Sequence, residues 1–285
     1  MDVSVIVCAH NEEQHLPSQL NALIEQECPG QWELIVVDNA STDKTALIAK
    51  RMAQRHPKLR VIQAEERKGK GYALAVGVRS ADSDLIVFCD ADDVVAPGWL
   101  AALVGGLASH DVVTGPHELD LLNPPWLADS RGRSIEEPLG SFFGIFPCIR
   151  GASWATHRRV WDAVGGVRED FSAGEDAEFS LRCWQSGVEI VGVPDAVVHY
   201  RYRDSPRALW RQGLAYGRSR PRIARILIDA GLTRPARFAG ARSWMLLAIS
   251  APTLLTRRGR AQWMWIAGNR AGQLMGSVSE RTFML

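Results

Sequence analysis

The chain has 285 residues, of which 46% are hydrophobic and 23% are charged, and its formal net charge is +1. This length allows one large domain, or one domain with an appendage, and it is sufficient to bury a full core. The apolar fraction excludes a disordered chain, and 25 glycines and 14 prolines without a period exclude a collagen-like one.

The cysteines are odd in number and widely spaced, and no two of them form a C-x-x-C pair. They are Cys8, Cys28, Cys89, Cys148 and Cys183. This pattern excludes a disulfide scaffold and a zinc ribbon, and it favours a reducing compartment. The first residues enter an apolar run without a basic leader, which predicts that the chain is not exported.

The first 110 residues alternate between two kinds of segment. Apolar, β-branched runs predict strands over residues 3–8, 34–37, 59–63 and 85–89. Helical stretches follow them at 11–27, 43–55, 71–80 and 97–107. Strands that alternate with helices predict an α/β fold, in which helices flank a mostly parallel sheet.

The alternation ends near residue 111. Residues 115–147 are rich in proline and glycine and predict a long connection, a kind of segment that is usually functional, for example as a lid over an acceptor. A strand over 149–155, a helix over 175–186 and a strand pair within 188–200 are expected next. Beyond Pro206 the sequence predicts only helices.

Charge divides the chain into an acidic body and a basic tail. Residues 1–200 hold 17 basic and 29 acidic residues, a net charge of −12, whereas residues 201–285 hold 16 arginines and three acidic residues, a net charge of +13. Basic tails bind nucleic acid or an anionic membrane face. The tail has no base-reading motif, and its tryptophans and apolar residues favour lipid.

The most apolar part of the tail is residues 244–255, WMLLAISAPTLL, which arginines flank on both sides. Twelve residues are fewer than the ~20 that a helix needs to cross a bilayer. The segment predicts helices that lie in the membrane interface; alternatively, they cover the catalytic body or form a short hairpin in the bilayer.

The strongest local motif is CDADD at residues 89–93, where three carboxylates follow an apolar strand. Ligands of open α/β sheets bind at this carboxyl edge. Neighbouring carboxylates favour a hard divalent cation together with a diphosphate. The alternative is a turn that leads to the helix after Pro97.

Two further motifs follow neighbouring strands. Asp38 ends the run LIVVD and suits a base N–H or a ribose hydroxyl, although a helix N-cap is the alternative. The segment RKGKG at residues 67–71 could bring backbone N–H groups and an ammonium to phosphate, or could be a flexible basic turn. It matches neither the P-loop nor the dinucleotide-binding pattern.

Five blocks together resemble the family 2 glycosyltransferases, whose fold is the GT-A nucleotide-sugar fold. The blocks are VSVIVCAHNEE, VVDNASTD, RKGKGYALAVG, CDADD and GEDAEFSLR, in the family's order between residues 3 and about 200. One departure is Ala75, where many members have Asn, which puts one polar contact in doubt.

The resemblance implies a role for each matching residue. The donor nucleotide would be bordered or bound by Ala9, Asn11, Glu13, Asp38, Lys70, Gly71, Asp90 and Ala91, with Asp38 at the base and Asp90 at the ribose. Asp92 would coordinate Mn²⁺ or Mg²⁺ on the diphosphate. His199 would be a further metal ligand, or else a structural histidine.

For the transfer step, the resemblance implies that Asp176 is the general base and that Glu175 binds hydroxyls beside it. Both are alternatively first-turn acids of a helix. Gly151 and Trp154 would border the acceptor, with the indole stacked on a sugar, unless Trp154 is a core residue. A single carboxylate base predicts inversion at the anomeric carbon.

We therefore expect a catalytic domain at 1–204, with a nucleotide half (1–110) and an acceptor half (111–204), and a basic amphipathic helical region at 205–285. Its function would be metal-dependent, inverting transfer from a nucleotide-diphosphate sugar, UDP before GDP, to a hydroxyl of a lipid-linked acceptor or of an envelope or natural-product glycan. Its place would be cytoplasmic, peripheral on the inner face of the cell membrane, without a nucleic-acid partner.

Two alternatives stay open at this point. A nucleotidyltransferase that forms nucleotide sugars would need a glycine-rich turn directly after the first strand, where CAHNE has none. The other alternative is a non-catalytic module that binds nucleotides or nucleic acid.

Overall fold

The computed structural model describes residues 2–171, 173–232 and 239–282. The chain divides into two compact units. Unit 1 comprises Met1–Leu122, Arg133–Phe171 and Glu175–Arg201, and unit 2 comprises Asn123–Gly132, Ser172–Gly174 and Tyr202–Leu285. Each unit is described by itself below.

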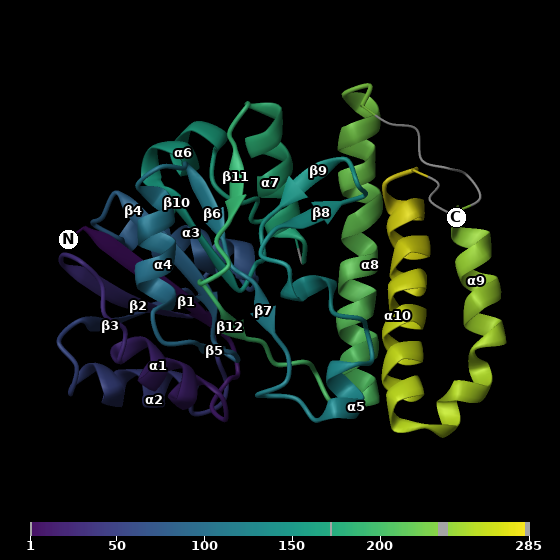
Figure 1. Cartoon of the computed structure of the whole chain (residues 1–285), viewed down its shortest axis with the longest axis horizontal. Helices are drawn as coiled ribbons and strands as arrows, with labels where there is room; N and C mark the ends of the chain where they lie inside the picture. Colours follow the sequence, from purple (N-terminus) through teal and green to yellow (C-terminus); the bar gives the residue numbers. More distant parts are fainter. Residues whose placement is uncertain (1, 172, 233–238, 283–285) are drawn as a thin grey trace. The chain divides into compact units, whose positions relative to one another are not determined.

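Unit 1 is built on a seven-stranded sheet in the order β11-β6-β10-β4-β1-β2-β3 (Figure 1). Its strands are β1 (Val3–Ala9), β2 (Trp32–Asp38), β3 (Leu59–Gln63), β4 (Leu85–Asp90), β6 (Val112–Thr114), β10 (Ser153–His157) and β11 (Ile190–Gly192). Every neighbouring pair is parallel except those of β10, which runs antiparallel to both β4 and β6. The predicted α/β fold with a mostly parallel sheet is confirmed.

Helices bury both faces of this sheet, which explains why its strands lack polar alternation. The α-helices of unit 1 are α1 (Leu16–Ile24), α2 (Thr45–Ala53), α3 (Lys70–Ser80), α4 (Trp99–Leu107), α6 (Arg158–Val164) and α7 (Glu175–Gln185). Val5 and Val7 belong to the core layer with α1, α2 and α4. Ile6, between them in sequence, belongs to the layer with α3, α6 and α7. Alternate side chains of β1 thus pack into the two hydrophobic layers on opposite faces of the sheet.

The region expected as a long connection contains short elements. They are β7 (His117–Glu118), α5 (Pro125–Ala128), η1 (Ser134–Glu136), β8 (Gly140–Phe142) and β9 (Phe146–Cys148). β7 joins a small sheet of order β5-β12-β7 with β5 (Val94–Val95) and β12 (Val198–His199), and β8 pairs with β9. The small sheet therefore ties residues 94–95, directly after the acidic motif, to His199.

Unit 2 contains α8 (Pro206–Asp229), α9 (Ala239–Ile249), η2 (Ala251–Leu255) and α10 (Arg257–Ser279). Ser205 caps α8 by accepting a hydrogen bond from Ala208 N, and Thr256 caps α10 in the same way from Gly259 N. α8 and α10 lie side by side, and α9 lies along the other side of α10 (Figure 1). The helical C-terminal extension is therefore present, as predicted.

Glycines allow the close packing of α8 on α10. A Cβ atom on Gly217 or Gly272 would lie within 3 Å of the backbone of the opposite helix, and one on Gly276 would lie 2.5 Å from Arg218 O. Backbones this close leave no room for side chains in the seam. Among the described helices, none has a stretch both long and apolar enough to cross a bilayer.

Candidate active site

The carboxyl edge of the central sheet gathers the acidic strand ends. In the strand register Cys8 lies opposite Asp90, and Ala9 lies opposite Asp38. Because β1 lies between β4 and β2, Asp90 and Asp38 are two strand spacings apart, roughly 10 Å. That separation suits a ligand with two ends, such as a base and a diphosphate.

Three carboxylates cluster at the carboxyl end of β4. Oxygen atoms of Asp90, Asp92 and Asp93 lie within 4.8 Å of one another. Asp93 is only 1% exposed; its Oδ1 accepts a hydrogen bond from Arg201 N at 2.7 Å, and its Oδ2 is buried without a partner. Burial, followed by repulsion from Asp92, raises the pKa of Asp93 well above its usual range. A divalent cation would relieve this repulsion, and carboxylate oxygens are the donors that Mg²⁺ and Mn²⁺ prefer.

Lys70 brings a positive charge into contact with Asp90 and Glu175. It is the first residue of α3, and its Nζ lies 2.5 Å from Asp90 Oδ1 and 3.8 Å from Glu175 Oε1. Burial opposes its charge, but Asp90 and Glu175 outweigh burial and raise the pKa of Lys70 well above its usual range. Lys70 therefore links the edge of the sheet to the start of α7.

Glu175 and Asp176 form the first turn of α7. Glu175 is 6% exposed, and burial raises its pKa to about 7 although Lys70 opposes the increase. Asp176 Oδ1 accepts a hydrogen bond from Ala177 N at 2.8 Å. A Cβ atom at Gly151 would lie 2.7 Å from Asp176 Oδ2, so only glycine leaves this carboxylate in its place. Glu175, Asp176, Lys70 and Asp90 thus belong to one group of charges.

The predicted nucleotide-binding residues after β1 contact the loop after β2. Asn11 Oδ1 accepts a hydrogen bond from Thr42 N at 2.7 Å, and Glu13 Oε2 accepts one from Lys44 N at 3.0 Å. Asp38 is 1% exposed, and its Oδ1 is buried without a partner. Asn11 and Glu13 hold the loop in position, whereas Asp38 keeps an acceptor available.

Two amides that the sequence analysis did not single out hold this edge together. Asn39 donates from Nδ2 to Ala64 O and Arg67 O, and its Oδ1 accepts from Gly69 N, so it fixes the loop that leads to Lys70. Gln19 is fully buried; its Nε2 donates to Asp90 O and its Oε1 accepts from Val95 N. An isolated amide in a helix or a turn has no spacing pattern, and only the position of Asn39 directly after Asp38 gave a signal.

Trp154 corrects one expectation. It is 1% exposed in β10, and its ring stacks on Phe88 at a centroid distance of 4.0 Å and contacts Phe179 at 5.2 Å. Aromatic side chains therefore surround the indole, and it has no free face for a sugar. Trp154 is a core residue, which was the alternative at the level of sequence.

Two other expected residues have structural partners. A Cβ atom at Gly71 would lie 2.7 Å from Arg168 O, so close backbone packing explains this glycine without phosphate. His199 lies outside the carboxylate group formed by the described residues, and its Nδ1 is 2.6 Å from Glu118 Oε2. It pairs with Val94 across the small sheet, so it is next to the acidic turn, with its Nε2 as the remaining ligand atom.

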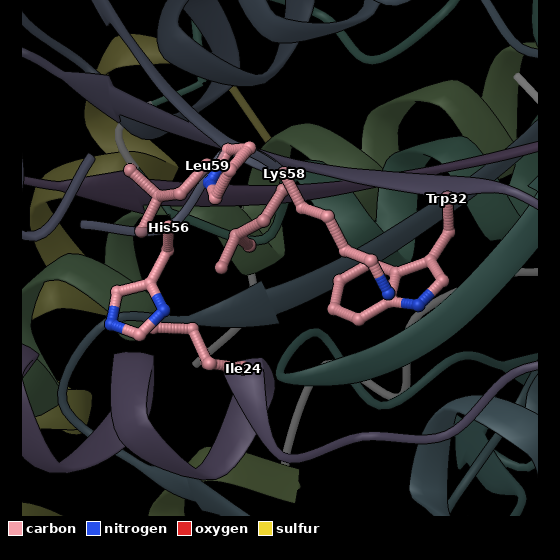
Figure 2. Close-up of a pocket in the computed structure, with 7 residues that line it drawn as sticks. Ile24, Trp32, His56, Lys58 and Leu59 are labelled. Atoms are coloured by element: carbon pink, nitrogen blue, oxygen red, sulfur yellow. The ribbon is translucent and has the colours of Figure 1, made fainter. Parts of the chain in front are cut away.

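A cavity of about 210 Å³ lies at the opposite edge of the sheet, where β2 and β3 begin (Figure 2). Lys58 extends over the ring of Trp32, with its Nζ 4.7 Å from the ring centroid. The lining residues include Ile24, His56 and Leu59 but no acidic residue. This cavity is therefore separate from the acidic edge.

Comparisons with known proteins agree with this geometry. Two family models match, Glycosyl transferase family 2 over residues 4–132 and Glycosyl transferase family group 2 over residues 85–269. A dolichyl-phosphate beta-glucosyltransferase of Mus musculus is 34% identical over 179 residues, which are 59% of this chain and 52% of that protein. The chain spans between 31% and 65% of the length of the curated relatives compared.

Solved structures share the fold. The mannosyltransferase PcManGT of Pyrobaculum calidifontis, in complex with GDP-Man and Mn²⁺, superposes with a TM-score of 0.64 at 24% identity and covers 96% of this chain and 86% of its own. Residues 1–349 of S. aureus TarS with UDP-GlcNAc give 0.56 at 16% identity, over 99% and 93% of the two chains. The fold of this chain is thus of the GT-A glycosyltransferase type.

Proposed function

Since the chain belongs to the family 2 glycosyltransferases, we propose that it transfers a sugar from a nucleotide diphosphate to an acceptor hydroxyl, with inversion at the anomeric carbon. The observation that supports this most directly is the group of opposite charges at one edge of the sheet. Asp90, Asp92 and Asp93 form one carboxylate group, and Lys70 contacts both Asp90 of this group and Glu175.

In this proposal, the donor binds along the edge from Asp38 to Asp92. The free oxygen of Asp38 accepts from the base, and Asp90 accepts from the ribose. Asp92, with Asp93 beside it, would hold Mn²⁺ or Mg²⁺, which would supply positive charge to the leaving diphosphate when bound. His199 would be the further ligand, through its Nε2 atom. Lys70, which lies beside Asp90, would bind the phosphates.

The acceptor is activated from the other side. Asp176, at the amino end of α7 where the helix dipole favours an anion, takes the proton of the attacking hydroxyl. Glu175 accepts hydrogen bonds from hydroxyls beside it, and Gly151 leaves space for the Asp176 carboxylate. Because one base acts opposite the departing diphosphate, the reaction is a single displacement.

The donor base and the acceptor class are narrower proposals. UDP is our first choice and GDP the second; the two structural neighbours hold GDP-Man and UDP-GlcNAc. We favour a lipid-linked acceptor on the cytoplasmic face of a membrane; the name of the mouse relative refers to a lipid phosphate. Residues 1–204 would suffice for the chemistry, and residues 205–285 would contact the membrane.

The test is nucleotide binding by thermal shift, with UDP, GDP, dTDP and ADP, each with and without Mn²⁺. We expect one nucleotide to raise the melting temperature only with the metal, and D92N to lose this shift. D176N should keep the metal-dependent shift but lose transfer, since the base acts only on the acceptor. A D92N variant that binds as the parent does would refute the metal assignment.

A further inference from the structure

The outer surface of α9 is apolar although it faces solvent. The helix packs through a narrow stripe, in which Leu247 is 5% exposed and its carbonyl accepts a hydrogen bond from Trp263 Nε1 at 3.0 Å. Around this stripe the exposed residues are large and apolar, and η2 adds one more: Trp244 (38%), Met245 (57%), Leu246 (51%), Ile249 (67%) and Leu255 (88%). The outer face of a helix in a soluble protein is usually polar, so this surface is fitted to a partner.

Arginines border the apolar residues. Arg257, Arg258 and Arg260, in the first turn of α10, are all exposed. That turn contains no acidic residue, and the sequence from 230 to 279 contains none either. The partner must therefore accept both apolar side chains and a dense positive charge.

The position of these arginines is unfavourable for the helix itself. The amino end of a helix carries partial positive charge, and acidic residues stabilise it there. Two arginines directly after the cap Thr256 do the opposite. A local rule that is broken on an exposed surface indicates a binding role, because folding gains nothing from it.

We propose that the exposed apolar residues and the arginines beside them dock on a bilayer that contains anionic lipid. We call them the α9–η2 surface: Trp244, Met245, Leu246, Ile249, Leu255, Arg257, Arg258 and Arg260. The apolar side chains enter the boundary between head groups and acyl chains, and the arginines bind lipid phosphates. Trp244 suits the head-group level, where indoles accumulate. The inference rests on the membrane-side location proposed above and is independent of the transfer chemistry.

The test is co-sedimentation of the full chain with vesicles of phosphatidylcholine alone and of phosphatidylcholine with 30% phosphatidylglycerol. We expect binding at least about tenfold tighter to the anionic vesicles, and weaker binding at high salt. R257E/R258E should remove most of this preference, and L246E/I249E should weaken binding at least about tenfold.

Two features of the design separate docking from misfolding. R257E/R258E places acids at a helix amino end, so it should not lower the melting temperature even as it loses vesicle binding. The matched control is L47E/R51E on α2, which also replaces an exposed leucine and an exposed arginine, and it should bind vesicles within about twofold of the parent.

Several outcomes would overturn the proposal. The proposal fails if the parent protein does not bind anionic vesicles, or if L246E/I249E binds them with the affinity of the parent. A parent that is dimeric and becomes monomeric in L246E/I249E, without vesicle binding, would assign the surface to a second copy of the chain. Competition by RNA that L246E/I249E does not alter would assign the arginines to nucleic acid. If vesicles bind but no nucleotide shifts the melting temperature, docking stands and the transfer proposal fails.

Discussion

Replacement of Lys70 by methionine removes the ammonium group that contacts Asp90 and Glu175 at the acidic edge. Lys70 Nζ is 2.5 Å from Asp90 and 3.8 Å from Glu175, and these two side chains are 23% and 8% exposed. Loss of one partner of a buried ion pair costs about 3–5 kcal/mol. Because the Lys70 side chain is itself 34% exposed, solvent reduces this. We expect K70M to lower the free energy of unfolding by about 2–3 kcal/mol at pH 8 without metal.

The cost should depend on pH in a definite direction. The pKa of Glu175 is about 7 in the folded protein against 4.5 for the free side chain, so this carboxyl binds its proton more tightly when folded. Its contribution to stability is therefore best at low pH and is lost as the pH rises from about 4.5 through 7. Lys70 lowers that pKa, so K70M raises it further and extends the loss to higher pH.

Urea unfolding at pH 5.5 and pH 8, in the presence of EDTA, measures the cost of K70M at each pH. At pH 5.5 Glu175 is protonated in parent and variant, whereas Lys70 still faces Asp90, so the cost of K70M should be smaller than at pH 8 by about 1 kcal/mol but should not vanish. K58M is the matched control, since Lys58 packs on the ring of Trp32, and it should cost about 0.5–1 kcal/mol at both values. A K70M cost that is equal at the two pH values would refute the argument.

Three further predictions test other parts of unit 1. W154A should lower the free energy of unfolding by about 3–5 kcal/mol, since it removes the central ring of a stacked aromatic core. W154F should lower it less and should leave the KM for the acceptor unchanged in a transfer assay. A raised KM would show that Trp154 belongs to the acceptor site. Burial lowers the pKa of His117 to about 3 from 6.5, so its contribution to stability is complete above pH 6.5 and declines towards pH 3. Between pH 7 and pH 5 the free energy of unfolding of the parent should fall by about 2 kcal/mol more than that of H117F, because the histidine takes up a proton only in the unfolded chain. Urea unfolding at the two pH values measures this difference. N39A should lose about 2 kcal/mol and bind the donor nucleotide more weakly, since the loop before Lys70 loses three hydrogen bonds; donor affinity equal to that of the parent in titration would exclude this positioning role.

The parallel half of the fold was predictable because each of its signals is local. The β-branched run over 3–8 and the helix after Lys70 require no knowledge of distant partners. The direction of β10, in contrast, is not determined by a local signal. A strand was expected over 149–155 and forms over Ser153–His157, and its antiparallel register depends on where β4 and β6 leave space.

The site divides in the same way. Asp38 and Asp90 end apolar strands, so the general rule for sheet edges locates them. The link from Lys70 to Glu175 joins residues more than a hundred positions apart and is visible only in the folded chain. Trp154 was misassigned to the acceptor because an indole beside a sugar site and an indole in a core look the same in a sequence.

The glycine seam of unit 2 also determines when this unit can form during synthesis. The segment Asn123–Gly132 leaves the ribosome long before α10, yet Arg131 belongs with Gln212 of α8 and lies over the ring of Trp265 in α10. Likewise, the glycine-containing face of α8 stays exposed until residues 257–279 have left the ribosome. A chain that stops before α10 would therefore leave two early segments without their partner and would be a target for chaperones and proteases.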